Sequence, residues 1–172
     1  MKKEHLLVLM RHAKSDWNAE YRHDFDRPLS KRGRRDAEGM SRWLADQELG
    51  SVSLVSSTAV RALETAEYIL SELALDRTNF HLEEKLYACD QAMILDVINR
   101  QSQTDSTCII VAHNPALDQT LEFLCPATVR YTDKGKLMTT AAAAILSYSY
   151  SDTQTKINSV KLRTLMRPRE LV

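Results

Sequence analysis

The stretch HLLVLMRH, residues 5–12, carries the strongest signal for the fold. Residues 6–10 are a continuous apolar run, which is typical of a central strand covered on both faces. An arginine and a histidine, Arg11 and His12, follow directly. A second stretch of the same kind, TCIIVAH at residues 107–113, ends in His113. We therefore predict two buried strands that each present chemically active side chains at the carboxyl end.

Amphipathic stretches alternate with short apolar runs along the rest of the chain. Helices are predicted from the N-cap Ser30 to about Gln47, over 58–75, over 91–100, and from Asn114 to Leu124, with Asn114 as N-cap and Pro115 at the first helical position. Further strands are predicted over 51–56, 80–86, 141–150 and 156–165, and the tail from Arg167 is expected to pack loosely. This alternation predicts an α/β fold, a three-layer α/β/α sandwich with a mostly parallel central sheet. We expect residues 1–172 to form a single domain.

Composition excludes several function classes. Basic and acidic residues number 23 each, so the formal net charge is zero. This balance argues against a general nucleic-acid or acidic-membrane binder. The four glycines permit neither a dinucleotide-binding nor a P-loop motif. No cysteine is followed six positions later by arginine, which excludes the cysteine-phosphatase loop. The segment DFDRP, residues 24–28, lacks the strand and the last residue of an aspartyl-phosphate motif.

Cysteine usage and hydropathy indicate a compartment. The three cysteines, Cys89, Cys108 and Cys125, contain no CxxC pair and are expected to be reduced, buried side chains. The first apolar run is shorter than a signal peptide needs, and no segment approaches the ~20 apolar residues of a membrane span. We therefore expect a cytoplasmic protein with neither a membrane segment nor a cysteine-based zinc site, and we expect no cofactor.

Three strand ends converge in this arrangement. The first carries Arg11 and His12, the second leads through residues 56–58 to Arg61, and a later one ends in His113. Because ligands bind outside the carboxyl ends of such strands, these side chains are expected to meet at one edge, where helix N-termini add N–H donors. The sequence predicts a pocket for phosphate or sulfate. Arg61 could instead pair with Glu64 on its own helix.

Four motifs in this order resemble the histidine phosphatase superfamily, which has the phosphoglycerate-mutase-like fold. They are LMRHAKSDWN (9–18), RPLSKRG (27–33), SSTAVRALETA (56–66) and AHNP (112–115). The residues of the first and last motifs are most similar to those of the compact SixA-type phosphohistidine phosphatases. Ala13 and Ala112 stand where many members carry glycine. Alanine is tolerated at such a position if the backbone φ is negative.

The resemblance implies a metal-independent phosphatase. His12 would be the nucleophile, with the proton on its other ring nitrogen held by a hydrogen bond. Arg11 and Arg61 would clamp the phosphoryl oxygens, and a protonated His113 would add a donor. Ser15 and Asn18 are expected to lend hydrogen bonds to the phosphate.

The proton donor and the substrate leave alternatives open. Glu84, in the sequence EKLY (84–87), matches the family's acid, Glu83 is a near alternative, and both could be surface carboxylates. The expected substrate is phosphohistidine in a phosphoprotein, whose imidazole leaves without an acid. The alternatives are a phosphatase or mutase for small phosphate esters, and a phosphate-binding module with weak catalysis. Three arginines near the start of the first helix, Arg32, Arg34 and Arg35, are expected to be solvated, with steering of an acidic partner as the alternative.

Overall fold

Six strands and four helices make up the described part of the chain, which in this computed structural model comprises residues 5–101, 106–151 and 154–171. The strands are β1 His5–Arg11, β2 Val52–Ser56, β3 Phe80–Leu82, β4 Thr107–Ala112, β5 Ala143–Ser151 and β6 Gln154–Met166. The helices are α1 Lys31–Ala45, α2 Val60–Glu72, α3 Gln91–Gln101 and α4 Ala116–Leu124. Each predicted strand and helix therefore has a counterpart, with boundaries shifted by a few residues.

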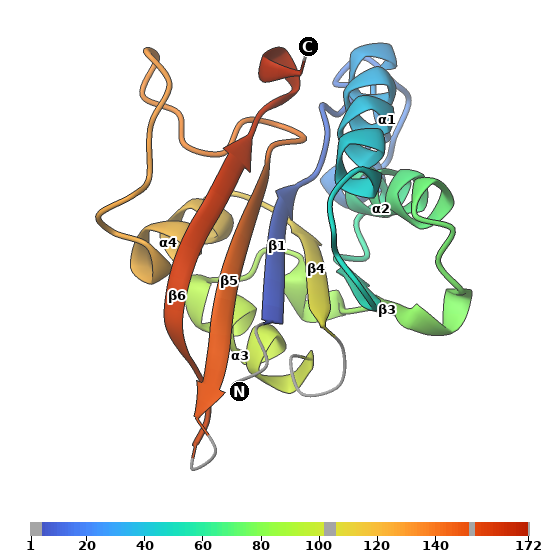
Figure 1. Cartoon of the computed structure of the whole chain (residues 1–172). Helices are drawn as coiled ribbons and strands as arrows, with labels where there is room; N and C mark the ends of the chain where they lie inside the picture. The colour runs from blue at the N-terminus through green and yellow to red at the C-terminus, as the bar shows by residue number, and fades with distance from the viewer. Residues whose placement is uncertain (1–4, 102–105, 152–153, 172) are drawn as a thin grey trace.

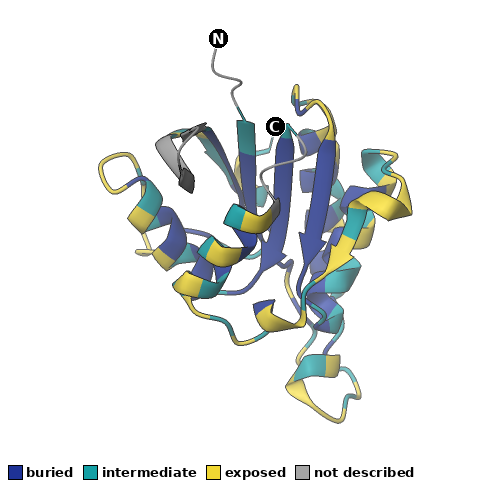
Figure 2. Cartoon of the chain, turned by 90° about the horizontal axis from the view of Figure 1, so that it is seen from below, coloured by how far each residue is buried: buried dark blue, intermediate teal, exposed yellow. Residues whose placement is uncertain are grey.

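The strands form one sheet in the order β3-β2-β4-β1-β5-β6 (Figure 1). The pairs β3–β2, β2–β4 and β4–β1 are parallel, whereas β5 is antiparallel to both β1 and β6. The prediction of a mostly parallel sheet is thus confirmed. The central strands β1 and β4 are buried along most or all of their length, as the continuous apolar runs indicated (Figure 2).

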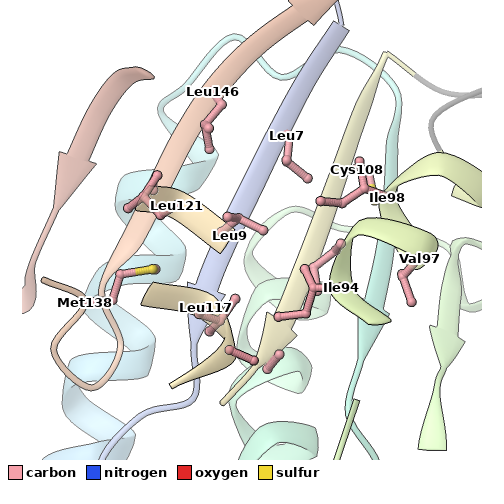
Figure 3. Packing of buried hydrophobic residues seen from close by; sticks show 14 of the residues in the cluster. Leu7, Leu9, Ile94, Val97, Ile98, Cys108, Leu117, Leu121, Met138 and Leu146 are labelled. Carbon is pink, nitrogen blue, oxygen red and sulfur yellow. The ribbon is translucent and has the colours of Figure 1, made fainter. Parts of the chain in front are cut away.

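Helices cover both faces of the sheet and make the three layers. Alternate residues of β1 point to opposite sides, so that Leu7 and Leu9 pack with α3 and α4, while Val8 and Met10 pack with α1 and α2. Figure 3 shows the first of these two clusters, with Ile94 and Ile98 of α3 and Leu117 and Leu121 of α4 facing the strands. Both clusters are apolar and fully buried at their centres, and they fix the ends of the central strands in space.

The start of α1 packs directly against the loop that follows β1. Ser30 caps the helix as predicted, because its hydroxyl accepts a hydrogen bond from the Gly33 N–H at 3.0 Å. The Ser30 N–H and hydroxyl both donate to the Lys14 carbonyl oxygen, at 2.9 and 3.0 Å. A Cβ atom at Gly33 would lie only 2.0 Å from that oxygen. Glycine is therefore required here by the close approach of two backbones.

Two local predictions are wrong. The stretch 80–86 is a strand only to Leu82 and continues as the 3-10 helix Glu84–Leu86. Asn114 does not cap α4, since Pro115 occupies the N-cap position and the Asn114 side-chain amide donates to the Met138 carbonyl oxygen at 3.2 Å. In both places a tertiary contact or a short turn has replaced the regular local structure that the sequence pattern favours.

The tail is packed, contrary to the expectation that it would be loose from Arg167. The guanidinium of Arg167 is buried, donates to the carbonyl oxygens of Leu137 and Arg130, and pairs with Glu170 at 2.8 Å. Pro168–Glu170 form a 3-10 helix, and Leu171 packs against the cluster under α1. The partners of Arg167 lie 30 and 37 residues away along the chain, so no local pattern announces them.

The sequence predicts neither a membrane-spanning segment nor a disulfide bond. None of the described helices has both the length and the apolar composition that crossing a bilayer requires. All three cysteines are free thiols, of which Cys108 and Cys125 are buried and Cys89 is half-buried.

The close approach at Gly33 yields a stability prediction. Replacing Gly33 with alanine should lower the free energy of unfolding by about 1–3 kcal/mol, because the new methyl group overlaps the Lys14 backbone. Gly39→Ala in the same helix is the matched control: its Cβ would meet only the end of the flexible Leu171 side chain, at 3.3 Å. Urea denaturation measures both variants. Equal stability of the two variants would contradict the packing described here.

Candidate active site

The register of the central strands brings the predicted site residues together. Arg11 of β1 is paired with Ala112 of β4, so His12 and His113 leave the sheet side by side. The two backbones stay in contact there, since the His12 N–H donates to the Ala112 carbonyl oxygen at 3.1 Å. The two imidazole rings have centroids 4.9 Å apart. Arg11, His12 and His113 therefore lie close together at the carboxyl edge of the sheet, which is where the sequence placed them.

The His12 ring is held in one tautomer. Its Nδ1–H donates to the Ala13 carbonyl oxygen at 2.8 Å, which leaves Nε2 unprotonated with a free lone pair. The pKa of His12 is lowered to about 3, chiefly by burial and also by His113 and the guanidinium groups of Arg61 and Arg11, while the bond to Ala13 partly opposes these effects. His12 is therefore neutral at physiological pH. The hydrogen bond that the family resemblance implied is present.

The loop after β1 is anchored on both sides. The Ala13 N–H donates to the Thr65 hydroxyl at 3.0 Å, and that hydroxyl donates to the Arg61 carbonyl oxygen at 2.7 Å. From the other side, the Ala141 N–H donates to the His12 carbonyl oxygen at 3.1 Å. Ala13 and Ala112 are fully buried, and neither is among the described residues with positive φ, so alanine suits both positions. These bonds fix the position of the His12 ring.

His113 is neutral, whereas a protonated ring was expected. Burial lowers its pKa to about 4, helped by the charge of Arg61, and Asp24 only partly offsets these effects. The ring is positioned by Ser57, whose hydroxyl lies 2.8 Å from Nε2. Ser57 itself follows β2 and donates its N–H to the Val111 carbonyl oxygen at 3.0 Å. The sequence analysis includes Ser57 only within the motif 56–66 and does not predict its contact with His113.

Arg61 points into the site and not along its own helix. It is buried, and its Nη1 and Nη2 donate to the backbone and the carboxylate of Asp24 at 2.7 and 3.0 Å. The suggested pairing with Glu64 is not formed, because the Glu64 carboxylate accepts the Leu29 N–H at 2.6 Å instead. The first-turn arginine of α2 is therefore matched by a carboxylate from the segment before α1.

Arg11 completes the group of cations. Its Nη1 donates to the Met138 carbonyl oxygen at 2.9 Å. Burial lowers its pKa, and the Asp118 carboxylate partly opposes this. An arginine stays protonated under these conditions. Within the described part of the chain, Arg11 Nε, Arg61 Nε and His113 Nδ1 are buried without a hydrogen-bond partner. Buried polar atoms without a partner are uncommon, and these three belong to residues of the predicted site, where a bound anion could satisfy them.

Asp24 is a member of the site that the sequence analysis missed. Besides Arg61, its carboxylate contacts Arg27 at 2.5 Å and the Tyr87 hydroxyl at 3.4 Å. The Tyr87 ring lies edge-on to His113, with centroids 5.8 Å apart. Asp24 lies in the 3-10 turn Asp24–Asp26, which has no apolar periodicity to attract attention. Its position three residues before the RPLS motif is the only signal that could have pointed to it.

The remaining candidates make no hydrogen bond or ion pair with this group in the described structure. Glu84 is exposed, and within the described residues its side chain makes no hydrogen bond or ion pair. Glu83 pairs with Arg100 at 3.0 Å. Ser15 is buried and bridges to Leu29 by its backbone, while Asn18 is exposed in a turn. The structure thus brings together Arg11, His12, Arg61 and His113, and does not join these four other residues to them.

The donor set of the site fits an anion better than a cation. Among the described residues, no group of three or more histidine, cysteine or acidic side chains is arranged to hold a metal ion. Arg11 and Arg61 instead place N–H donors and positive charge beside the two neutral imidazole rings.

The two low histidine pKa values predict a pH-dependent stability. Between pH 6.5 and about 4 the unfolded chain binds protons that the folded protein does not, so the fold loses stability as the pH falls through this window. The loss should reach up to about 1.4 kcal/mol per pH unit for each histidine.

Urea denaturation between pH 7 and 5 measures this slope. His113→Gln should flatten it, and His81→Gln, which removes an exposed histidine of β3, is the matched control. An unchanged slope in His113→Gln would contradict the burial of a neutral ring.

Comparison with known proteins agrees with this geometry. The sequence profile of the histidine phosphatase superfamily (branch 1) matches residues 7–90. A chloroplastic protein of Arabidopsis thaliana is 29% identical over 154 residues, which is 84% of this chain and 67% of the relative.

Among solved structures, the protein histidine phosphatase SixA complexed with tungstate has a TM-score of 0.77 at 21% identity, covering 97% of this chain and 99% of that one. A SixA-type protein from Nakamurella multipartitia has a TM-score of 0.75 at 25% identity, with 96% of both chains covered. Residues 7–90 therefore match the histidine phosphatase superfamily, and the chain as a whole shares the fold of the SixA-type phosphatases.

Proposed function

We propose that this phosphatase transfers the phosphoryl group to His12 and that its preferred substrate is phosphohistidine in a phosphoprotein. The observation that carries the proposal is the 2.8 Å hydrogen bond from His12 Nδ1–H to the Ala13 carbonyl oxygen. This bond directs the free lone pair of Nε2 away from the backbone, and the pKa of about 3 keeps that nitrogen unprotonated. A neutral, oriented imidazole is the form that can attack phosphorus.

The reaction has two steps in this proposal. In the first, His12 Nε2 attacks phosphorus in line, the bond from phosphorus to the leaving group breaks, and the leaving group takes the electron pair. In the second, water attacks the phosphorus of phosphorylated His12, the bond between phosphorus and Nε2 breaks, its electron pair returns to Nε2, and inorganic phosphate is released. The water proton departs to solvent or to the product. The bond to Ala13 holds the ring in the same tautomer throughout both steps.

Positive charge and N–H donors would stabilise the transition state. Arg11 and Arg61 face the point where the two strands end, and their charge suits the spread negative charge of a loose phosphoryl transition state. A phosphate dianion beside His113 would raise the pKa of that ring above its low substrate-free value. Loss of one such donor typically costs about 10²–10³ in rate. The tungstate held by the SixA structure supports the expectation that tetrahedral oxyanions, phosphate and sulfate among them, bind in this pocket.

The leaving group argues for phosphohistidine. An alkoxide leaving group needs a proton from an acid, whereas imidazole leaves readily without one. In the described structure Glu84 is exposed and joined to none of the four central residues, and Glu83 is held by Arg100. A site with two arginines, in which neither Glu83 nor Glu84 contacts the central residues, suits a substrate that brings its own good leaving group.

A second candidate function rests on Asp24. Its carboxylate contacts both Arg61 and the Tyr87 hydroxyl and is half-exposed, so it lies where a leaving oxygen could be protonated. If Asp24 served as the acid, small phosphate esters would be substrates as well. The contacts of Asp24 oppose this role, since one carboxylate oxygen is engaged with Arg27 and the other with Arg61.

A substrate panel tests the proposed function. We expect kcat/KM to be highest for a phosphohistidine peptide, lower for phosphoramidate, and lowest for para-nitrophenyl phosphate and phosphoglycerates. His12→Ala should abolish turnover of all of them. A preference for phosphoglycerates would favour the small-ester alternative, and normal turnover by His12→Ala would disprove the mechanism.

The proton donor is tested by comparing two substrates. Glu84→Gln should leave hydrolysis of phosphohistidine unchanged, and it should slow ester hydrolysis only if Glu84 is the acid. Asp24→Asn is the parallel test for Asp24, with Asp26→Asn as its matched control, because Asp26 is an exposed carboxylate of the same turn. Equal losses on both substrates would show that the residue concerned does not protonate the leaving group.

A further inference from the structure

A second region of positive charge adjoins the active site. A cavity of about 680 Å³ lies between the end of β1, the start of α1, the loop 131–140 and the tail 167–170. Arg11 lines this cavity, whereas His12, Arg61 and His113 do not. The cavity therefore opens beside the proposed phosphoryl site and shares one wall with it.

The charges of the cavity walls are strongly unbalanced. Seven cationic side chains line it, against two acidic ones: Arg11, Lys14, Arg32, Lys134, Lys136, Arg167 and Arg169, against Asp133 and Glu170. Two of the cations are already neutralised, since Arg167 pairs with Glu170 and Arg32 with Asp36. Asp133 is then the one lining carboxylate not engaged with a cation among the described residues.

Four of the cations have no partner. In the described structure the side chains of Lys14, Lys134, Lys136 and Arg169 make no hydrogen bond or ion pair, and all four are exposed. They come from three separate segments of a chain whose net charge is zero. Like charges gathered around one cavity repel one another, and a bound anion removes that repulsion. The hydroxyls of Thr132, Thr139 and Thr140 on the same walls add donors for anionic oxygens.

We propose that this cavity binds a second anionic group of the substrate, carried on the same molecule as the phosphoryl group. The inference rests on the proposed function, since Arg11 would hold the phosphoryl group at one end while the lysines hold the second anion. The shared chemistry is a carboxylate or phosphate a short distance from the transferred group. Its source is either an acidic side chain near a phosphohistidine or the second phosphate of a small bisphosphate.

The experiment measures binding in a background that cannot turn substrate over. Titration calorimetry at low ionic strength compares three proteins that all carry His12→Ala. The first has no other change, the second also carries Lys134→Gln and Lys136→Gln, and the third, the matched control, also carries Arg34→Gln and Lys161→Gln. The control removes the same charge from exposed residues outside the cavity. The ligands are two pairs: a phosphohistidine peptide with flanking glutamates or glutamines, and glucose 1,6-bisphosphate or glucose 6-phosphate.

The expected result is a second-anion advantage that depends on the cavity lysines. In at least one ligand pair, the member with the second anion should bind about fivefold or more tightly to His12→Ala and to the control. The advantage should disappear in Lys134→Gln/Lys136→Gln and weaken with added salt. A preference within the peptide pair identifies an acidic phosphoprotein as the source, and one within the glucose pair identifies a small bisphosphate.

Two results would overturn the inference. One is the absence of any advantage in both pairs, and the other is an equal advantage in the cavity variant and the control. Turnover of phosphoramidate, which carries no second anion, is measured separately with otherwise wild-type protein. That measurement tests the proposed function, and neither cavity lysine should affect it.

Discussion

The parallel pairing of β1 with β4, in the register Arg11 to Ala112, is the constraint on which the site depends. It places His12 and His113 on neighbouring chains at the same edge, with ring centroids 4.9 Å apart. A one-residue slip would turn every side chain of β1 to the other face. The two apolar clusters above and below the sheet prevent such a slip, because Leu7 and Leu9 fit one cluster and Val8 and Met10 the other. The packing of the hydrophobic core thus determines the relative positions of His12 and His113.

Burial among cations determines the protonation states in the site. Desolvation and the neighbouring guanidinium groups keep both imidazoles neutral, with pKa values of about 3 for His12 and about 4 for His113. A neutral His12 is the form that the proposed nucleophilic attack requires, with no separate base. Asp24 is held in the same environment by Arg61, Arg27 and Tyr87. In the proposed mechanism, an arriving phosphate would meet a site that is already charged and oriented, which would reduce the reorganisation required during reaction.

The central strands and the start of α1 could be predicted from the sequence, because strong local patterns mark them. The apolar runs before His12 and His113 mark the buried strands, and the Ser30 cap marks the start of α1. What escaped prediction depends on contacts between distant segments. The neutral state of His113 requires knowledge of its three-dimensional neighbours. The partner of Arg61 is 37 residues away, in a turn without periodicity, and the buried Arg167 finds its acceptors at similar separations.

The central claim is that His12 becomes phosphorylated during turnover. Rapid quenching of the reacting protein into alkaline detergent, with a radiolabelled phosphoryl donor, tests it most directly. The account predicts a transient label that survives alkali, is lost in acid, maps to the peptide containing His12, and is absent from His12→Ala. Turnover without any such label, or a label on another residue that persists in His12→Ala, would contradict the account.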